Sequence, residues 1–379
     1  MLSRVADSVY WMNRQIERAE NVARAVETAL DLALEGTITH GRLWNGLVCT
    51  FGDQADFWSR HGLADQAHVI TFLAFDTQNP NSIASCLHAA RENARTVRDM
   101  ISSPMWQEIN KAYLFVRAAG AGHAELHNPR EFLDEVKRAS QLITGVTDAT
   151  MSHGEAWHFA RLGRLIERAD KTSRVLDVEH YFQPAAARVA PPASAPGPSG
   201  PGAALVSGRD GGAGPGGEGA AARVAPAAAQ VAPPVAGPAP TTVGPGWDSV
   251  QWSAVLESAS ALEMYRKEYG AVSRRHVAEF LILDRAFPRA MHFCLIKAEE
   301  SLLAVTGGTK GTYSNAAEQR LGRLRSELDY GHIDEILGAE AGLHGFIDRF
   351  QTRLNGASDA IHETFFAAPP AEGATAAAP

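Results

Sequence analysis

The chain has 379 residues, of which 45% are hydrophobic, and a formal net charge of −8 at pH 7. This length and composition allow a sizeable core, in one large helical domain or in two average domains. Lysine and arginine form no run or stripe along the sequence. The composition therefore argues against a nucleic-acid-binding surface.

The cysteines and the apolar segments indicate in which cellular compartment the protein is expected. Cys49, Cys86 and Cys294 are odd in number and far apart, so we expect buried thiols rather than a zinc site or a disulfide framework. The start MLSRVADSVYW holds no apolar leader region, and no apolar run approaches the roughly 20 residues that span a bilayer. We therefore expect a cytoplasmic protein with no membrane segment.

Helical periodicity with start and stop signals runs through the first half of the chain. A first helix is predicted from Ser3, as N-cap, to Glu35, with Gly36 as its stop. Residues 41–75 hold short apolar segments broken by glycine and aspartate, which indicate two or three brief helices. The further helices predicted here cover residues 83–101, 103 onward, 129–150 and 155–182.

Residues 184–246 differ from the rest of the chain. Of these 63 residues, 45 are Ala, Pro or Gly and none is aromatic. Such a segment cannot bury enough apolar surface to offset its ordering entropy, so we predict a disordered linker, and likewise a disordered tail over 367–379.

Helical patterns resume at Trp247, and no sustained alternating pattern typical of strands occurs. The helices predicted after the linker cover residues 249–269, 273–284, 287–306, 314–330 and 342–366. We therefore predict an all-α fold: a single multi-helix array of about ten or more helices. Its two parts, 1–183 and 247–366, are interrupted by the linker rather than being separate domains.

A segment near the start of the chain repeats its charge pattern 150 residues later. The like-charged pairs at this offset are Arg14 and Arg164, Glu17 and Glu167, Arg18 and Arg168, Glu20 and Asp170, Arg24 and Arg174, and Glu27 and Asp177. On a helical wheel Glu20 lies about 40° and Glu27 about 20° from the apolar face centred on Ile16. Buried carboxylates are unfavourable unless paired. The two helices are therefore predicted to lie side by side with their acids and arginines cross-paired.

A simpler explanation of the repeat is surface support within each helix. Glu20 with Arg24 and Asp170 with Arg174 have the favourable i,i+4 order, which contributes a few tenths of a kcal/mol per exposed pair. That explanation does not account for the recurrence of Glu17 and its neighbours. A buried network could be purely structural, or it could line a site for a charged ligand. The sequence leaves both open.

Two further stretches carry charge in a pattern. Arg91, Arg95 and Arg98 share one helical face, where they could grip carboxylates or phosphates. We favour their role as counter-charge to the acids of the repeat. Asp284 is predicted to cap a helix with proline in its first turn, and Arg289, which the helix dipole disfavours there, is predicted to reach a carboxylate elsewhere.

The familiar catalytic and cofactor signatures are absent from the sequence. The stretch GGTKGT at 307–312 lacks the spacing of a phosphate-binding loop. Glu155 and His158 form one Glu-x-x-His element, whereas di-iron bundles need two of them with two further glutamates. We therefore predict no metal and no cofactor, and the catalytic residues, if any exist, stay unknown.

Four separated segments together carry a resemblance to a known family. They are LSRVADSVYWMNRQIERAENVAR, ARENARTVRDMISSPMWQEIN, ARLGRLIERADKTSRVLDV and EFLILDRAFPRAM. On these segments the chain resembles the bacterial alpha-E domain family over nearly its whole length outside 184–246. The resemblance implies a polar centre of unknown role, with Asp284 and Arg289 as secondary candidates. Its residues are Glu17, Arg18, Glu20, Arg24, Arg95, Arg98, Glu167, Arg168, Asp170 and Arg174.

The resemblance also implies a protein partner. The chain is similar to proteins encoded beside or fused to a circularly permuted ATP-grasp ligase, often with a transglutaminase-like peptidase, a context that suggests amide-bond formation. Three hypotheses follow: a helical partner of the ligase, an enzyme using acids of the repeat with arginines holding an anionic substrate, or a self-associating protein. An open pocket that reaches the acids favours the enzyme, and sealed, paired acids favour the partner.

Overall fold

The computed structural model describes residues 1–36, 39–122, 129–177 and 245–367. Within these ranges the chain forms fifteen α-helices and one π-helical turn and no strand. The prediction of an all-α, multi-helix array is confirmed. The predicted linker falls almost entirely on residues 178–244, and the predicted tail on 368–379, which lie outside the described residues.

The first half of the chain contributes eight of these α-helices. They are α1 (Ser3–Glu35), α2 (His40–Phe51), α3 (Gln54–His61), α4 (Gln66–Ile70) with the π-helical turn η1 (Thr71–Phe75), α5 (Ile83–Thr96), α6 (Ser103–Gly122), α7 (Pro129–Thr150) and α8 (Glu155–Leu176). Side chains cap several of them, as when Ser82 accepts a hydrogen bond from the Ser85 amide at the start of α5. Gly36 ends α1 in the left-handed conformation, as predicted, but the N-cap of α1 is Leu2 rather than Ser3.

The second half differs from its prediction at three places. Its helices are α10 (Pro245–Ser258), α11 (Leu262–Tyr269), α12 (Arg274–Leu283), α13 (Met291–Thr306), α14 (Ala316–Asp329), α15 (Ile333–Gly338) and α16 (Gly342–Phe365). The predicted helix 249–269 is broken at Ser260, whose φ of 48° lies in the left-handed region. The predicted helix 287–306 begins only at Met291, and the short α15 was not predicted.

Asp284 explains the late start of α13. Its Oδ1 accepts hydrogen bonds from the backbone amides of Ala286 and Phe287, so it closes a turn after α12. The prediction that Asp284 caps a helix with Pro288 in its first turn is therefore wrong. The turn brings Arg289, just before α13, against α1.

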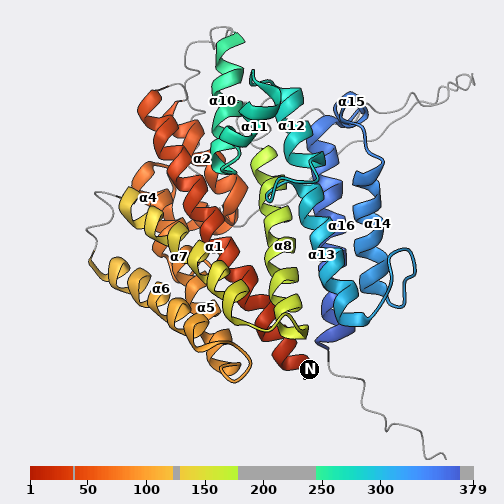
Figure 1. Cartoon of the computed structure of the whole chain (residues 1–379). Coiled ribbons are helices and arrows are strands. Elements are labelled where there is room, and N and C mark those ends of the chain that lie inside the picture. The colour runs from red at the N-terminus through yellow and green to blue at the C-terminus, as the bar shows by residue number, and fades with distance from the viewer. Residues whose placement is uncertain (37–38, 123–128, 178–244, 368–379) are drawn as a thin grey trace, which may run out of the picture. The chain divides into compact units, whose positions relative to one another are not determined.

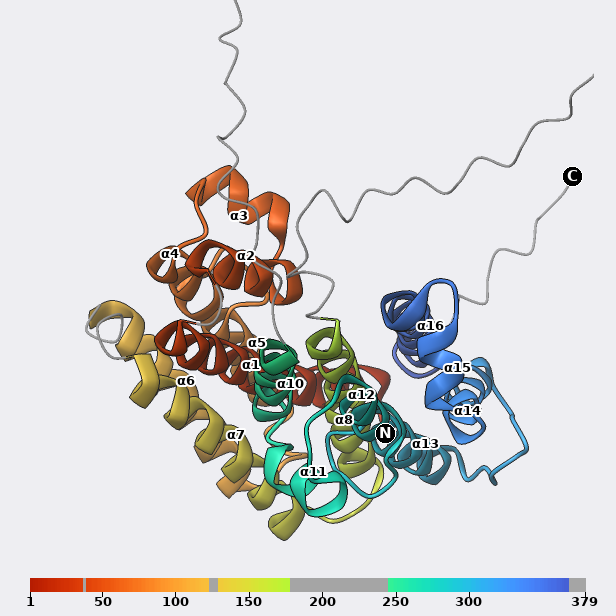
Figure 2. The ribbon, with the colours of Figure 1, turned by 90° about the horizontal axis from the view of Figure 1, so that it is seen from above.

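Helices from both ends of the chain pack around α1 and α8. Figures 1 and 2 show α1 and α8 side by side, with α5 against α1 and α13 against α8. The described residues before and after the predicted linker belong to one compact unit and share one hydrophobic core. The long helices α1 and α8 thus form the centre of the array.

A glycine sets the spacing between these two central helices. A Cβ added at Gly163 of α8 would lie 2.3 Å from the backbone carbonyl oxygen of Tyr10 in α1. No side chain fits at that distance, so glycine lets the two backbones approach closely. Long side chains on the turns that follow can therefore reach from one helix to the other.

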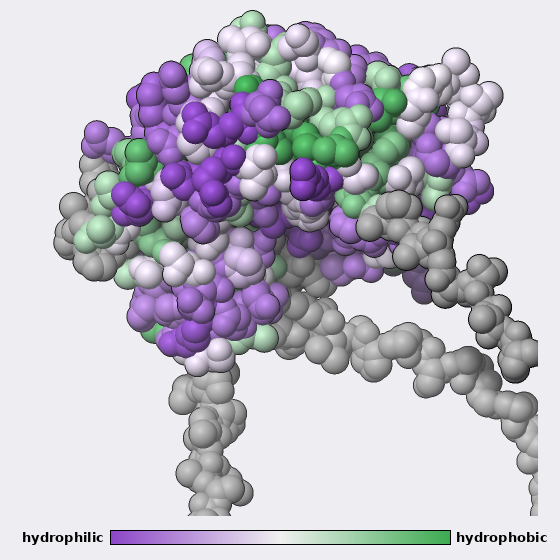
Figure 3. Space-filling view, turned by 90° about the horizontal axis from the view of Figure 1, so that it is seen from below, coloured by the Kyte–Doolittle hydropathy of each residue, from purple (hydrophilic) through white to green (hydrophobic). Residues whose placement is uncertain are grey.

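The outer surface is mixed. On the face that Figure 3 shows, hydrophobic residues form a band among hydrophilic ones. Among the described residues, none of the helices combines the length and the apolar character that crossing a bilayer requires.

Candidate functional site

Two reciprocal ion pairs join α1 to α8. Arg168 of α8 donates from Nε and Nη2 to Oε1 and Oε2 of Glu17, both at 2.8 Å. Arg18 of α1 donates from Nε to Oε1 of Glu167 at 2.6 Å and from Nη2 to Oε2 at 3.1 Å. Each helix thus gives its glutamate to the arginine of the other. The two carboxylates are 1% and 0% exposed. The predicted cross-pairing between buried acids and arginines is therefore present for Glu17, Arg18 and their counterparts.

Further cations reinforce each pair. Arg289 donates from Nη1 to Oε1 of Glu17 at 3.2 Å and from Nη2 to Glu20. This residue therefore reaches carboxylates on another element, as predicted. On the other side of the interface, Arg14 donates from Nε to Oε2 of Glu167 at 2.9 Å.

Glu20 and Asp170 do not cross-pair between α1 and α8 as predicted: each pairs with the arginine four residues later on its own helix. Glu20 accepts from Arg24 at 2.6 Å and also from Ser140 Oγ of α7 at 2.6 Å. Asp170 Oδ2 accepts from Arg174 Nε at 2.9 Å. Both acids are buried, so these i,i+4 pairs lie inside the protein rather than on a solvated face.

Lys171 belongs to the site, although the 150-residue charge repeat did not predict it. The offset of 150 places it opposite Asn21, an uncharged residue, and so no match occurs. Lys171 Nζ lies 3.0 Å from Asp170 Oδ2 and 3.5 Å from Glu167 Oε1. Asn21 instead donates to Glu17 Oε1 at 3.0 Å and accepts from an arginine, so the two halves of the site are not identical.

We call this assembly of four acids and the cations that contact them the Glu-Arg centre. Its members are Glu17, Glu20, Glu167, Asp170, Arg14, Arg18, Arg24, Arg168, Lys171, Arg174 and Arg289.

The cations keep the buried acids ionised. Burial by itself raises the pKa of Glu17, but the charges of Arg168 and Arg289 outweigh it and lower that pKa to about 2. Burial likewise opposes ionisation of Glu167, and the cations around it, Lys171 first, hold its pKa well below the ordinary value. Both glutamates are therefore carboxylates at neutral pH and accept hydrogen bonds only.

Arg164, the counterpart of Arg14 in the repeat, is placed differently. Its Nε is buried and has no hydrogen-bond partner, and it makes no ion pair among the described residues. Burial first, and then the like charge of Arg168, lower the pKa of Arg164. The 150-residue repeat therefore predicts which residue types meet but not the partner of each one.

The ends of the repeat also do not cross-pair. Glu27 accepts a hydrogen bond from Lys137 of α7, and Asp177 Oδ1 lies 2.9 Å from His344 Nδ1 of α16. The pseudo-symmetric pairing is thus confined to the middle of α1 and α8.

The arginine row of α5 lies outside the Glu-Arg centre. Arg95 donates to Glu92 on its own helix, and its side chain is 60% exposed. Arg98 lies over the ring of Trp106 at 4.8 Å, and Arg91 donates to Asn110 of α6. The prediction that this row neutralises the acids of the repeat is wrong, because that face of α5 meets α6 while other cations satisfy the acids.

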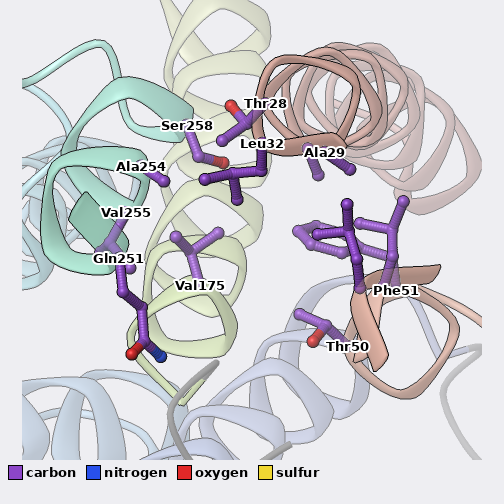
Figure 4. Close-up of a pocket in the computed structure, with 13 residues that line it drawn as sticks. Thr28, Ala29, Leu32, Thr50, Phe51, Val175, Gln251, Ala254, Val255 and Ser258 are labelled. Atoms are coloured by element: carbon purple, nitrogen blue, oxygen red, sulfur yellow. The ribbon is translucent and has the colours of Figure 1, made fainter. Parts of the chain in front are cut away.

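A small apolar pocket lies beside the site. Figure 4 shows Thr28, Ala29 and Leu32 facing Val175 and Ala254 across it, so that α1, α8 and α10 all contribute to its walls. Its volume of about 50 Å³ is far below the roughly 150 Å³ of an apolar cavity that holds benzene. The pocket is therefore a packing gap rather than a site for a substrate.

A larger, polar pocket of about 190 Å³ reaches the Glu-Arg centre itself. Its charged wall consists of Arg14, Arg18, Asp170, Lys171 and Arg174. In the part of the chain that the structure describes, no group of three or more His, Cys, Asp or Glu side chains is placed to hold a metal ion.

A comparison with protein families gives one match. The family Alpha-E, described as a predicted alpha-helical domain with a conserved ER motif, matches residues 1–194 and 221–366. The Glu-Arg dipeptide occurs in this chain at Glu17-Arg18 and at Glu167-Arg168, the four residues that form the reciprocal pairs. Comparisons with curated proteins and with solved structures found no match.

Proposed function

Because the chain belongs to the Alpha-E family, we propose that it acts as a non-catalytic helical partner of an ATP-grasp ligase. The proposed setting is a system that forms or modifies amide bonds in the cytoplasm, with a transglutaminase-like peptidase as a further component. In this role the chain docks on the ligase or presents its substrate. The context implied by the family resemblance supports this proposal.

The observation that carries the proposal is the burial of three of the four carboxylates of the Glu-Arg centre, none of which lines the polar pocket. Glu17, Glu20 and Glu167 are 0–2% exposed, and each accepts hydrogen bonds from at least two side chains. An acid or base catalyst must come within hydrogen-bond reach of its substrate. Three sealed and paired carboxylates favour a structural role, because Glu17 and Glu167 hold α1 against α8 and Glu20 ties α1 to α7 and to Arg289.

The alternative is an enzyme in its own right, and Asp170 is the residue that favours it. Asp170 lines the polar pocket, and its Oδ1 has no hydrogen-bond partner among the described residues. However, Lys171 and Arg174 outweigh the effect of burial and lower the pKa of Asp170. A general base works best with a pKa near the operating pH, so this carboxylate suits pairing better than proton transfer.

A pull-down of the tagged, full-length chain from an extract of its native cells tests the proposal. We expect mass spectrometry to identify an ATP-grasp ligase among the captured proteins, and the tagged ligase to capture this chain in return. An unrelated helical protein with the same tag serves as the control. Failure of the ligase to bind in both directions would overturn the partner role.

A further inference from the structure

The polar pocket is built by five separate parts of the fold. Arg14 and Arg18 come from α1, Lys171 from α8 and Asn355 from α16, and the end of α2 and the turn before α5 complete the wall. Arg14 and Lys171 are buried and Arg18 is half-buried, whereas Asn355 is exposed. The pocket thus runs from the surface at Asn355 to cations held inside the protein.

Positive charge is in excess on this wall. Arg14, Arg18 and Lys171 all contact Glu167, which carries a single negative charge. Arg14, Arg18 and Lys171 thus share two carboxylates, Glu167 and Asp170, and Asp170 is also paired with Arg174. Cations that share too few acids in a partly buried site favour an added negative charge.

Residues that line the pocket keep hydrogen-bond donors that no described residue uses. Arg14 uses Nε and Nη1, and its Nη2 makes no hydrogen bond to the described residues. The Lys171 ammonium has three donors and contacts two carboxylates. Asn81 accepts from Arg18 through Oδ1, which leaves its amide nitrogen as a donor.

We propose that this pocket binds an oxyanion, the phosphate or carboxylate group of a small ligand, through Arg14, Lys171 and the amide side chains at its rim. The guanidinium group of arginine and the ammonium group of lysine are the usual protein partners of phosphate and carboxylate groups. The volume of about 190 Å³ exceeds the roughly 150 Å³ of a cavity that holds benzene, so there is room for such a group with a short attachment. The proposal does not rest on the partnership with a ligase.

Calorimetric titration of the full chain with inorganic phosphate and, separately, with acetate at constant ionic strength tests the proposal. We expect saturable binding of at least one of them, in the millimolar range or tighter. The Asn355→Asp variant puts a carboxylate at the rim and is expected to weaken binding about tenfold, by charge repulsion near a protein surface. Lys171→Gln removes a donor and a charge and is expected to weaken binding similarly.

The matched control is Gln107→Glu. Gln107 is exposed on α6, which contributes no residue to the pocket, and the change adds the same charge as Asn355→Asp. Its affinity should equal that of the original chain. Binding of phosphate alone or of acetate alone identifies the group. Absence of saturation by both anions, or equal weakening in Asn355→Asp and Gln107→Glu, would overturn the site. Asn355 is exposed, so the test stands even where Lys171→Gln fails to fold.

Discussion

Replacing Arg168 with alanine should remove the bidentate pair on Glu17 and leave a buried carboxylate short of a partner. Both donated bonds are 2.8 Å long, and Glu17 is 1% exposed. Breaking a buried pair from one side typically destabilises a protein by 3–5 kcal/mol. Arg289 remains paired with Glu17 at 3.2 Å, although it is also paired with Glu20. We therefore expect a destabilisation at the lower end of this range, about 3 kcal/mol. Urea unfolding followed by circular dichroism measures this change.

Two comparison variants sharpen the test. Arg18→Ala should cost less than Arg168→Ala, because Glu167 keeps Arg14 at 2.9 Å and Lys171 at 3.5 Å. Arg353→Ala removes an arginine that is 53% exposed and paired at the surface with Glu327, and exposed pairs contribute less than about 1 kcal/mol. If Arg168→Ala changes the free energy of unfolding no more than Arg353→Ala does, the buried-pair reasoning is refuted.

Three further predictions follow from the same interface. Since the pKa of Glu17 is lowered to about 2, the stability that its carboxylate contributes is present above pH ~4.5 and is lost as the pH falls toward 2. The loss amounts to about 3 kcal/mol in all. In urea unfolding at stepped pH, the free energy of unfolding of Glu17→Gln should therefore fall less steeply than that of the original chain. Gly163→Ala would force a Cβ against a carbonyl oxygen of α1 and should destabilise the protein by ~2 kcal/mol or more. Gly145→Ala in α7, where an added Cβ meets nothing within 4 Å, should be neutral or stabilise the protein by up to ~1 kcal/mol. Equal thermal midpoints for the two variants would contradict the close approach of α1 and α8. Burial raises the pKa of the Cys86 and Cys294 thiols to about 12, so mass spectrometry after brief iodoacetamide treatment should find both unmodified in the folded protein and modified in urea.

The helical array and the central pairing could be predicted because both leave a periodic trace. Apolar spacing marks the helices, and the offset of 150 marks Glu17, Arg18 and their counterparts as equivalent. Buried acids require cationic partners, and the opposite helix supplies them for Glu17 and Glu167. The cations paired with Glu20 and Glu27 come from elsewhere. These arguments depend only on local spacing and on charge type.

What escaped prediction depends on tertiary neighbours. Lys171 matches an uncharged residue in the repeat. Arg95 has the spacing of a site residue, but its side chain is 60% exposed and pairs with Glu92 on its own helix. The break at Ser260 occurs inside a continuous helical pattern, where Ser260 Oγ accepts a hydrogen bond from Arg24 of the Glu-Arg centre. The polar pocket is likewise invisible in the sequence, because segments more than 300 residues apart line it.

A double-mutant cycle between Glu17 and Arg168 tests the central claim most directly. The four proteins are the original chain, Glu17→Gln, Arg168→Gln and the double variant, compared by their free energies of unfolding in urea. Reciprocal buried pairing between α1 and α8 predicts a coupling free energy of about 2 kcal/mol or more. A coupling below about 0.5 kcal/mol, the level of independent sites, would contradict it.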